Sequence, residues 1–82
     1  MKLPRDLSGH DLVKALRKYG YYVVRQSGSH IRLTSSIHGL EHHITVPAHK
    51  SLKVGTLNAI ISSIAVYLEM DRETLSQELF GK

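Results

Sequence analysis

The sequence lacks cysteine altogether, which excludes disulfides and cysteine-ligated zinc sites. Small secreted domains commonly need such cross-links, so their absence favours a cytoplasmic location for this protein.

The apolar runs in the sequence are also short. The longest apolar-rich stretch, residues 57–70, is interrupted by polar side chains and does not reach the roughly 18–20 residues of a membrane span. Since the opening MKLPRDLSGHD has no signal-peptide apolar segment either, we expect a mature, soluble chain without a membrane partner.

The chain is short and unevenly charged. Its 82 residues, of which 41% are hydrophobic, suit one domain over residues 1–82, near the lower size limit for a self-sufficient core. The net charge is +4: residues 1–53 hold nine basic residues against three acidic ones, whereas residues 54–82 hold two against four. A basic half favours a polyanionic partner, most commonly nucleic acid, with ordinary surface charge as an equal alternative.

Capping residues place the first helix. Ser8 is a typical N-cap with Asp11 three residues later, and Leu7 and Leu12 have the spacing of a hydrophobic staple. An apolar stripe with helical period follows. Gly20 after this stripe predicts the end of the helix, because glycine is the residue that most often stops one.

Three segments have the composition of strands, namely residues 21–26, 30–35 and 42–46. In the second of them apolar and polar residues alternate, which predicts one face toward the core and one face away from it. The residues expected to face the core are Ile31 and Leu33, and those expected on the other face are His30, Arg32 and Thr34.

A second helix is expected to begin near Gly55 or Thr56, because the apolar residues that follow recur with helical period. These residues are Leu57, Ile60, Ile61, Ile64, Ala65 and Leu68. Asp71 is a typical N-cap for a short last helix, whose inward residues would be Leu75, Leu79 and Phe80. The order α-β-β-β-α with an extra terminal helix predicts an α+β domain, in which helices pack on a three-stranded antiparallel sheet.

Three segments at the joints of this pattern resemble the HicA family of mRNA interferase toxins. LPRDLSGHDLVKALRKYGY is similar to the family's first helix, VVRQSGSHIRL contains its glycine–serine–histidine, and VPAHKSLKVGTLNAII contains its Pro-x-His, basic spacer and Gly-Thr-Leu. Each motif is short, but three in order over about residues 3–80 make a specific match. Many relatives have a glycine after the first two turns of the second helix, whereas residues 64–68 here read IAVYL, which predicts a longer helix.

The resemblance implies a fold like that of a double-stranded-RNA-binding domain. It implies an endonuclease that cleaves mRNA and thereby arrests translation, with the catalytic histidine at His30. It also implies a HicB-like antitoxin as the partner that binds and inhibits the toxin.

The chemistry that this resemblance assigns to His30 is physically reasonable. RNA can be cleaved without a metal or another cofactor, because its own 2′-hydroxyl is a nucleophile, and histidine, with a reference pKa of about 6.5, can accept or donate the proton. Gly28 and Ser29 before it would let an RNA backbone approach closely. The alternative is an uninvolved surface histidine on a solvent-facing strand, which the residues alone would favour.

Lys50 and Lys53 precede the second helix, whose N-terminus would present free N–H groups to a phosphate. Thr56 would add a hydroxyl donor there or cap the helix. We predict that these residues bind the RNA backbone. A solvated basic loop with an ordinary helix cap is the alternative.

Arg25 and Arg32 lie on neighbouring predicted strands, where a guanidinium could stabilise the charge that develops on phosphorus. Arg32 is preferred because it shares the predicted face of His30. Ser29 would hydrogen-bond to His30 or to phosphate, although its place in a turn explains it equally well.

Six histidines raise the question of a metal site. Adjacent His42 and His43 must point to opposite faces of a strand, and the sequence contains no HExxH motif, so no metal is expected. His49 is better explained as a residue that fixes its loop or contacts substrate. The role of His38 is left open.

Two other classes of function compete with an RNA-cleaving enzyme. A non-catalytic RNA-binding module of the same fold would bind RNA by shape and phosphate contacts and would need no histidine at His30. A protein-interaction domain would not explain the excess of basic residues in the first part of the chain.

Overall fold

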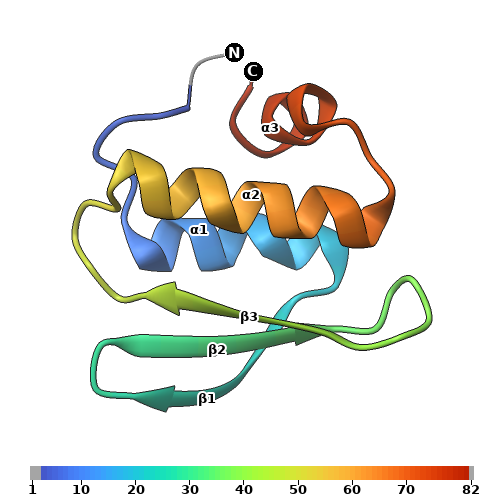
Figure 1. The fold of residues 1–82 in the computed structure, drawn as a ribbon. Coiled ribbons are helices and arrows are strands. Elements are labelled where there is room, and N and C mark those ends of the chain that lie inside the picture. Colours follow the sequence, from blue (N-terminus) through green and yellow to red (C-terminus); the bar gives the residue numbers. More distant parts are fainter. Residues whose placement is uncertain (1–2, 82) are drawn as a thin grey trace.

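The computed structural model describes residues 3–81 and has the predicted α+β architecture. Its elements are α1 (Gly9–Leu16), a 3₁₀ turn η1 (Arg17–Tyr19), β1 (Tyr22–Ser27), β2 (His30–Ser35), β3 (His42–Pro47), α2 (Val54–Leu68) and α3 (Arg72–Phe80). The sheet is antiparallel with the order β1-β2-β3. Figure 1 shows α1 and α2 on one face of the sheet, with α1 behind α2, and α3 at the top of the view.

The first helix begins and ends as its capping residues predict. The Ser8 hydroxyl accepts a hydrogen bond from the Asp11 N–H at 3.0 Å, and Gly20 has the left-handed φ of 77°. The last turn before Gly20 is the tighter η1, so α1 itself ends at Leu16. Leu12 and Leu16 are fully buried and bring this helix onto the sheet.

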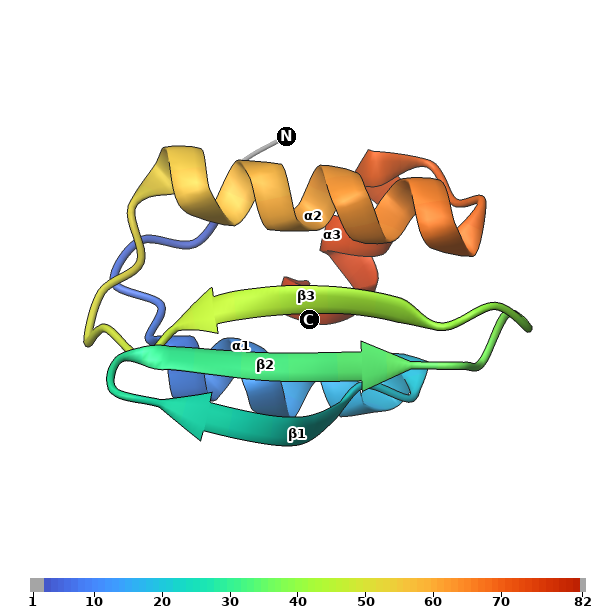
Figure 2. The same ribbon diagram turned by 60° about the horizontal axis from the view of Figure 1, so that its bottom comes forward.

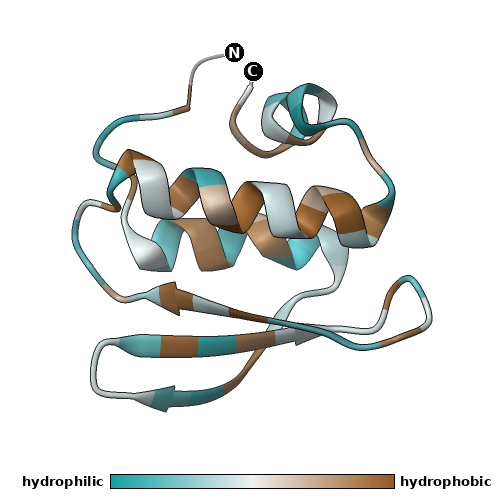
Figure 3. Ribbon diagram, viewed as in Figure 1, coloured by the Kyte–Doolittle hydropathy of each residue, from teal (hydrophilic) through white to brown (hydrophobic). Residues whose placement is uncertain are grey.

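The central strand β2 separates the two faces of the sheet. Ile31 and Leu33 are buried under the helices, whereas His30 and Arg32 are exposed, as their alternation predicts. The alternation is visible as brown and teal bands in Figure 3. Thr34 differs from the expectation of a solvent-facing residue: it is only 3% exposed, because it lies between strand neighbours on both sides and its hydroxyl is hydrogen-bonded to His43 Nδ1 at 2.7 Å.

The edge strand β1 runs one residue later than predicted and is irregular. Tyr21 lies outside it and is 1% exposed, so its aromatic ring belongs to the core. The pairing with β2 shifts between Val23 and Arg25, which makes Val24 the extra residue of a β-bulge. The bulge decides which side chains of β1 share a face with those of β2.

The second helix is longer than predicted at its start. It begins at Val54 rather than at Gly55 or Thr56, because Lys53 has extended backbone and its carbonyl accepts the first helical bond from the Leu57 N–H. Its predicted apolar residues, Leu57, Ile60, Ile61, Ile64, Ala65 and Leu68, are all buried. The helix continues to Leu68, which confirms the longer helix expected from IAVYL.

The last helix begins at its predicted cap, since the Asp71 carboxylate accepts a hydrogen bond from the Thr74 N–H at 3.1 Å. Leu75 is fully buried, and Leu79 and Phe80 pack against the core, as expected. Glu78 ties α3 to η1, because it accepts a hydrogen bond from the Tyr19 hydroxyl. Burial together with this carboxylate raises the pKa of Tyr19 to about 12. No helix among residues 3–81 is long and apolar enough to cross a bilayer.

The loop of residues 48–53 is held by backbone hydrogen bonds to two other parts of the chain. The Ala48 N–H donates to the Ser29 carbonyl at 2.7 Å, and the Gly9 N–H donates to the His49 carbonyl at 2.9 Å. The Leu52 N–H likewise donates to the Leu7 carbonyl at 2.7 Å. The start of α1 and the start of β2 are therefore fixed relative to one another through this loop.

Gly9 is required at the contact between α1 and this loop. A Cβ atom at Gly9 would overlap the Pro47 carbonyl, which is backbone and cannot move aside, whereas a Cβ atom at Gly55 would meet open space. We predict that Gly9→Ala lowers the free energy of unfolding by about 1–3 kcal/mol because of this overlap. Urea unfolding followed by circular dichroism measures the effect.

Gly55→Ala is the matched control, since it adds the same methyl group to a helix without a contact. It should leave stability unchanged or raise it by about 0.5–1 kcal/mol through the better helix propensity of alanine. Equal stabilities of the two alanine variants would show that the contact at Gly9 is not a constraint.

Candidate active site

His30 is the first residue of β2 and lies on the face of the sheet that no helix among residues 3–81 covers. Figure 2 brings this face forward, with the strands in front of α1. The turn before His30 contains Gly28 at a φ of 57°, which glycine adopts without strain. His30 pairs with Ser27 of β1 on one side and with Pro47 of β3 on the other, and its side chain is exposed.

A concavity of about 270 Å³ lies on this face around His30. Its lining residues are Arg25, Ser27, His30, Arg32 and Thr45. The two arginines are direct partners across β1 and β2. The salt bridges formed among residues 3–81 involve neither of them, so that two permanently charged guanidinium groups face the solvent beside an imidazole. Such a surface can attract and orient an anion with several oxygens, such as a phosphodiester.

The position of Arg25 could not be predicted from the sequence. In a regular strand Arg25 would share a face with Val23, which pairs with core-facing Leu33. The bulge at Val24 turns Arg25 to the other face, opposite Arg32. The sequence preferred Arg32 alone, and the structure brings both arginines to His30.

The other predicted RNA-binding residues surround this concavity without lining it. Ser29 is exposed in the turn before His30, and its carbonyl holds the loop of residues 48–53. Lys50 and Lys53 are exposed on that loop, which leaves β3 directly after the residue paired with His30. Thr56 is half-buried in the first turn of α2 and is not its cap.

The loop histidine His49 acts through its backbone. Its carbonyl accepts the hydrogen bond from the Gly9 N–H, while its side chain is exposed. Any residue could make this backbone contact, so the role expected for the His49 side chain, in fixing the loop or contacting substrate, stays a prediction.

His42 has a structural environment that the sequence did not indicate. Its Nδ1 is hydrogen-bonded to the Tyr21 hydroxyl at 2.6 Å, and its Nε2 is hydrogen-bonded to the Ser63 hydroxyl at 3.0 Å. Its ring stacks on that of Tyr67, with a centroid distance of 4.7 Å and an interplanar angle of 11°. His42 and His43 point to opposite faces of β3, as predicted, because His43 instead contacts Thr34.

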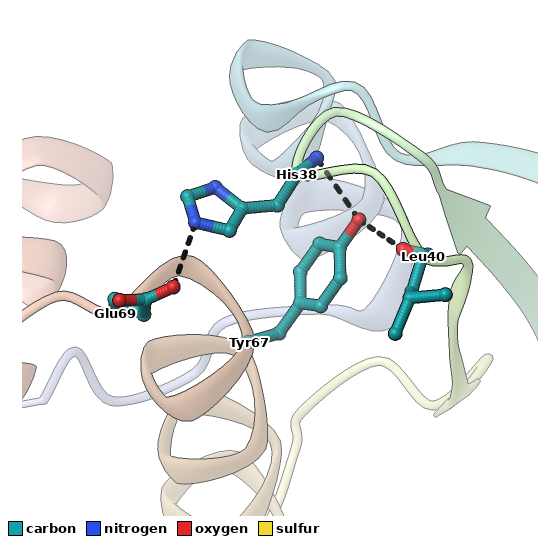
Figure 4. A network of polar contacts seen from close by, with 4 residues as sticks. All are labelled: His38, Leu40, Tyr67 and Glu69. Carbon is teal, nitrogen blue, oxygen red and sulfur yellow. Dashed lines mark hydrogen bonds and ion pairs between the residues drawn. The ribbon is translucent and has the colours of Figure 1, made fainter.

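Tyr67 also holds the loop between β2 and β3, which answers the open question about His38. The Tyr67 hydroxyl donates to the Leu40 carbonyl at 2.5 Å and accepts from the His38 N–H at 3.0 Å, and the His38 Nε2 lies 3.1 Å from a Glu69 carboxylate oxygen (Figure 4). His38 therefore joins this loop to the end of α2. No group of three metal-ligating side chains suited to an ion occurs among residues 3–81.

Partial burial lowers the pKa of His42 from its ordinary value of 6.5, and nearby His43 lowers it further. The folded state therefore takes up a proton at His42 less readily than the unfolded state does. The stability that depends on a neutral His42 is present above about pH 6.5 and is lost as the pH falls below it. We predict that the free energy of unfolding decreases from pH 7 to pH 5.

His42→Gln removes the titrating group but keeps polar atoms for Tyr21 and Ser63. This variant should show a smaller loss of stability between pH 7 and pH 5 than the wild type. Urea unfolding at several pH values measures the two slopes, and an unchanged slope in the variant would mean that His42 does not cause the loss.

The fold and this face together define an α+β domain that carries a histidine and two arginines on an open sheet surface. A family model described as the HicA toxin of bacterial toxin–antitoxin systems matches residues 9–66. The matched range contains α1, the whole sheet and most of α2, so the chain belongs to the HicA toxin family. No curated protein and no solved structure matches the chain. Family membership makes this protein the toxin of a toxin–antitoxin pair and implies an antitoxin as its partner.

Proposed function

We propose that this toxin is a metal-independent endoribonuclease that cleaves mRNA, with His30 as general acid or general base. The observation that carries the proposal is the exposed imidazole of His30 in a concavity that it shares with two guanidinium groups. Attack by the 2′-hydroxyl of RNA on its own phosphate needs a group that moves a proton, and it places extra negative charge on the phosphate oxygens. An imidazole can do the first, and Arg25 and Arg32 can stabilise the second.

The substrate backbone would extend from this concavity across the neighbouring loop. Lys50 and Lys53 supply two exposed positive charges there, Ser29 supplies a hydroxyl beside His30, and Thr56 supplies one in the first turn of α2. Lys53 is at the N-cap of α2 and makes no side-chain capping bond, so backbone N–H groups of the first turn are available to a phosphate.

Cleavage of mRNA would arrest translation in the cytoplasm, so the toxin must be inhibited when it is not needed. We propose that the antitoxin partner is HicB-like and that it covers the face of the sheet that carries His30. A protein on this face would exclude RNA from the concavity.

The proposal predicts that removal of the His30 imidazole impairs RNA cleavage, whereas removal of another exposed imidazole does not. His30→Ala should lower the rate of RNA cleavage roughly 10²–10⁴-fold, the usual range for a general acid or base, and should abolish growth arrest on expression. Cleavage of a labelled transcript, with a chelator present, measures the rate. His10→Ala is the matched control, because His10 is an equally exposed histidine on α1.

If His30→Ala cleaves RNA at the wild-type rate, His30 is not catalytic. If the wild-type protein binds the transcript but leaves it intact, the protein is a non-catalytic RNA-binding module.

The lysines of the loop should act through charge alone. Lys50→Ala and Lys53→Ala should each weaken RNA binding and lower the slope of log affinity against log salt by about 0.7 per contact with single-stranded RNA. Titration of RNA at several salt concentrations measures the slope. Lys14→Ala, which removes an exposed charge from α1, should leave the slope unchanged, and equal slopes for all three variants would contradict the assignment.

A further inference from the structure

The open face of the sheet carries a third row of side chains beyond those of His30 and the arginines. Tyr22 of β1, Thr34 of β2 and His43 of β3 are direct partners across the three strands, so their side chains lie on one face. Thr34 is in alternation with His30 and Arg32 on β2, which places the row on the face of the candidate active site. Thr34 is buried between its two aromatic neighbours.

Tyr22 is available to a ligand, whereas the adjacent tyrosine is not. The Tyr21 side chain is 1% exposed and bonded to His42, but Tyr22 is 52% exposed. His43 is held in place by Thr34 at 2.7 Å and lies 3.7 Å from a Glu41 carboxylate oxygen. The row therefore presents one exposed aromatic ring on β1 and a fixed imidazole on β3, with Thr34 between them.

The order of the three rows matches the chemistry of a polynucleotide. Along β2 the face presents the His30 imidazole, then the arginine pair, and then the Tyr22 row, with about 7 Å between successive rows. Guanidinium groups suit a phosphate, whereas the third row contains no guanidinium, and its His43 end lies against the carboxylate of Glu41, which would repel a phosphate. A nucleobase is uncharged and stacks on an aromatic ring, so the third row suits a base.

We infer that Tyr22 is a stacking platform for an unpaired base of single-stranded RNA, about 13 Å from His30 and therefore within a few nucleotides of the cleaved bond. This inference rests on the proposed function in that the bound ligand is RNA. A base in a duplex has both faces covered by its neighbours and cannot stack on Tyr22. The substrate is accordingly a single-stranded segment, although the fold is like that of domains that bind duplex RNA.

A protein strand added to the edge of β1 is the competing use of Tyr22, because Val23 and Val24 beside it are also exposed. The bulge at Val24 disfavours it, since a bulge interrupts the regular hydrogen-bonding edge that an added strand needs. The arginine charges on the same face also fit RNA better than a protein strand.

The stacking can be tested directly with short single-stranded RNA that contains one 2-aminopurine, whose fluorescence is quenched by stacking. In the His30→Ala background, which keeps the RNA intact, binding should quench the probe when it is placed at one position near the cleavage site. Adding Tyr22→Ala should remove the quenching and weaken binding about tenfold, the scale of one base–aromatic stack. Tyr22→Phe, which retains the ring, should preserve both.

Val24→Ala is the matched control, because Val24 is an equally exposed apolar residue of the same strand. With His30 intact, Tyr22→Ala should raise the KM for single-stranded RNA more than it lowers kcat.

Equal quenching and equal affinity with and without Tyr22 would overturn the inference, as would equal cleavage of duplex and single-stranded RNA of one sequence. Loss of antitoxin binding in Tyr22→Ala with RNA binding unchanged would also overturn it and assign Tyr22 to the protein partner. Failure of the wild type to cleave any RNA would instead contradict the proposed function, because the fluorescence titration tests stacking without cleavage.

Discussion

The structure depends on the difference between the two faces of its small sheet: the helices bury one face and leave the other exposed. β2 and β3 supply the apolar face that the helices bury, through Ile31, Leu33, Ile44 and Val46, whereas all six residues of the edge strand β1 are exposed. The helices supply most of the remaining core through residues such as Leu12, Leu16, Ile61 and Ile64, so they pack on this face and leave the other open. Charged side chains can lie on the open face without being buried, so no charged group has to be removed from water. The candidate active site depends on this difference between the buried face and the open face.

The open face carries two chemically different kinds of side chain, namely guanidinium groups and an imidazole. Arg25 and Arg32 carry guanidinium groups, which attract an anion and can bind two of its oxygens at once. His30 contributes an exposed imidazole, the side chain most often used for general acid–base catalysis. In the proposed function the arginines bind the phosphate and His30 moves the proton, and all three side chains occupy exposed positions on two neighbouring strands.

Local patterns in the sequence predicted the elements well because their causes are local. Ser8 and Asp71 cap helices through atoms three residues away, and the alternation of β2 follows from strand geometry alone. The missed features depend on partners far away in the sequence. Val24 shows no sign of a bulge by itself, and His42 is explained only by Tyr21, Ser63 and Tyr67, which three different parts of the chain provide. The family resemblance singled out His30 as the candidate catalytic residue, whereas no local pattern could show that Arg25 would lie beside it.

The loop of residues 48–53 connects the beginning of the chain to its middle, and this has a consequence for synthesis of the toxin. Gly9 and Leu7 find their hydrogen-bond partners only at His49 and Leu52, which emerge from the ribosome much later. Contacts between such distant residues form late, because the intervening chain must be closed into a loop first. A nascent chain that ends before this loop lacks both the lysines of the loop and the support that fixes the turn before His30. The support of the turn before His30 therefore forms only after residues 48–53 have been synthesised.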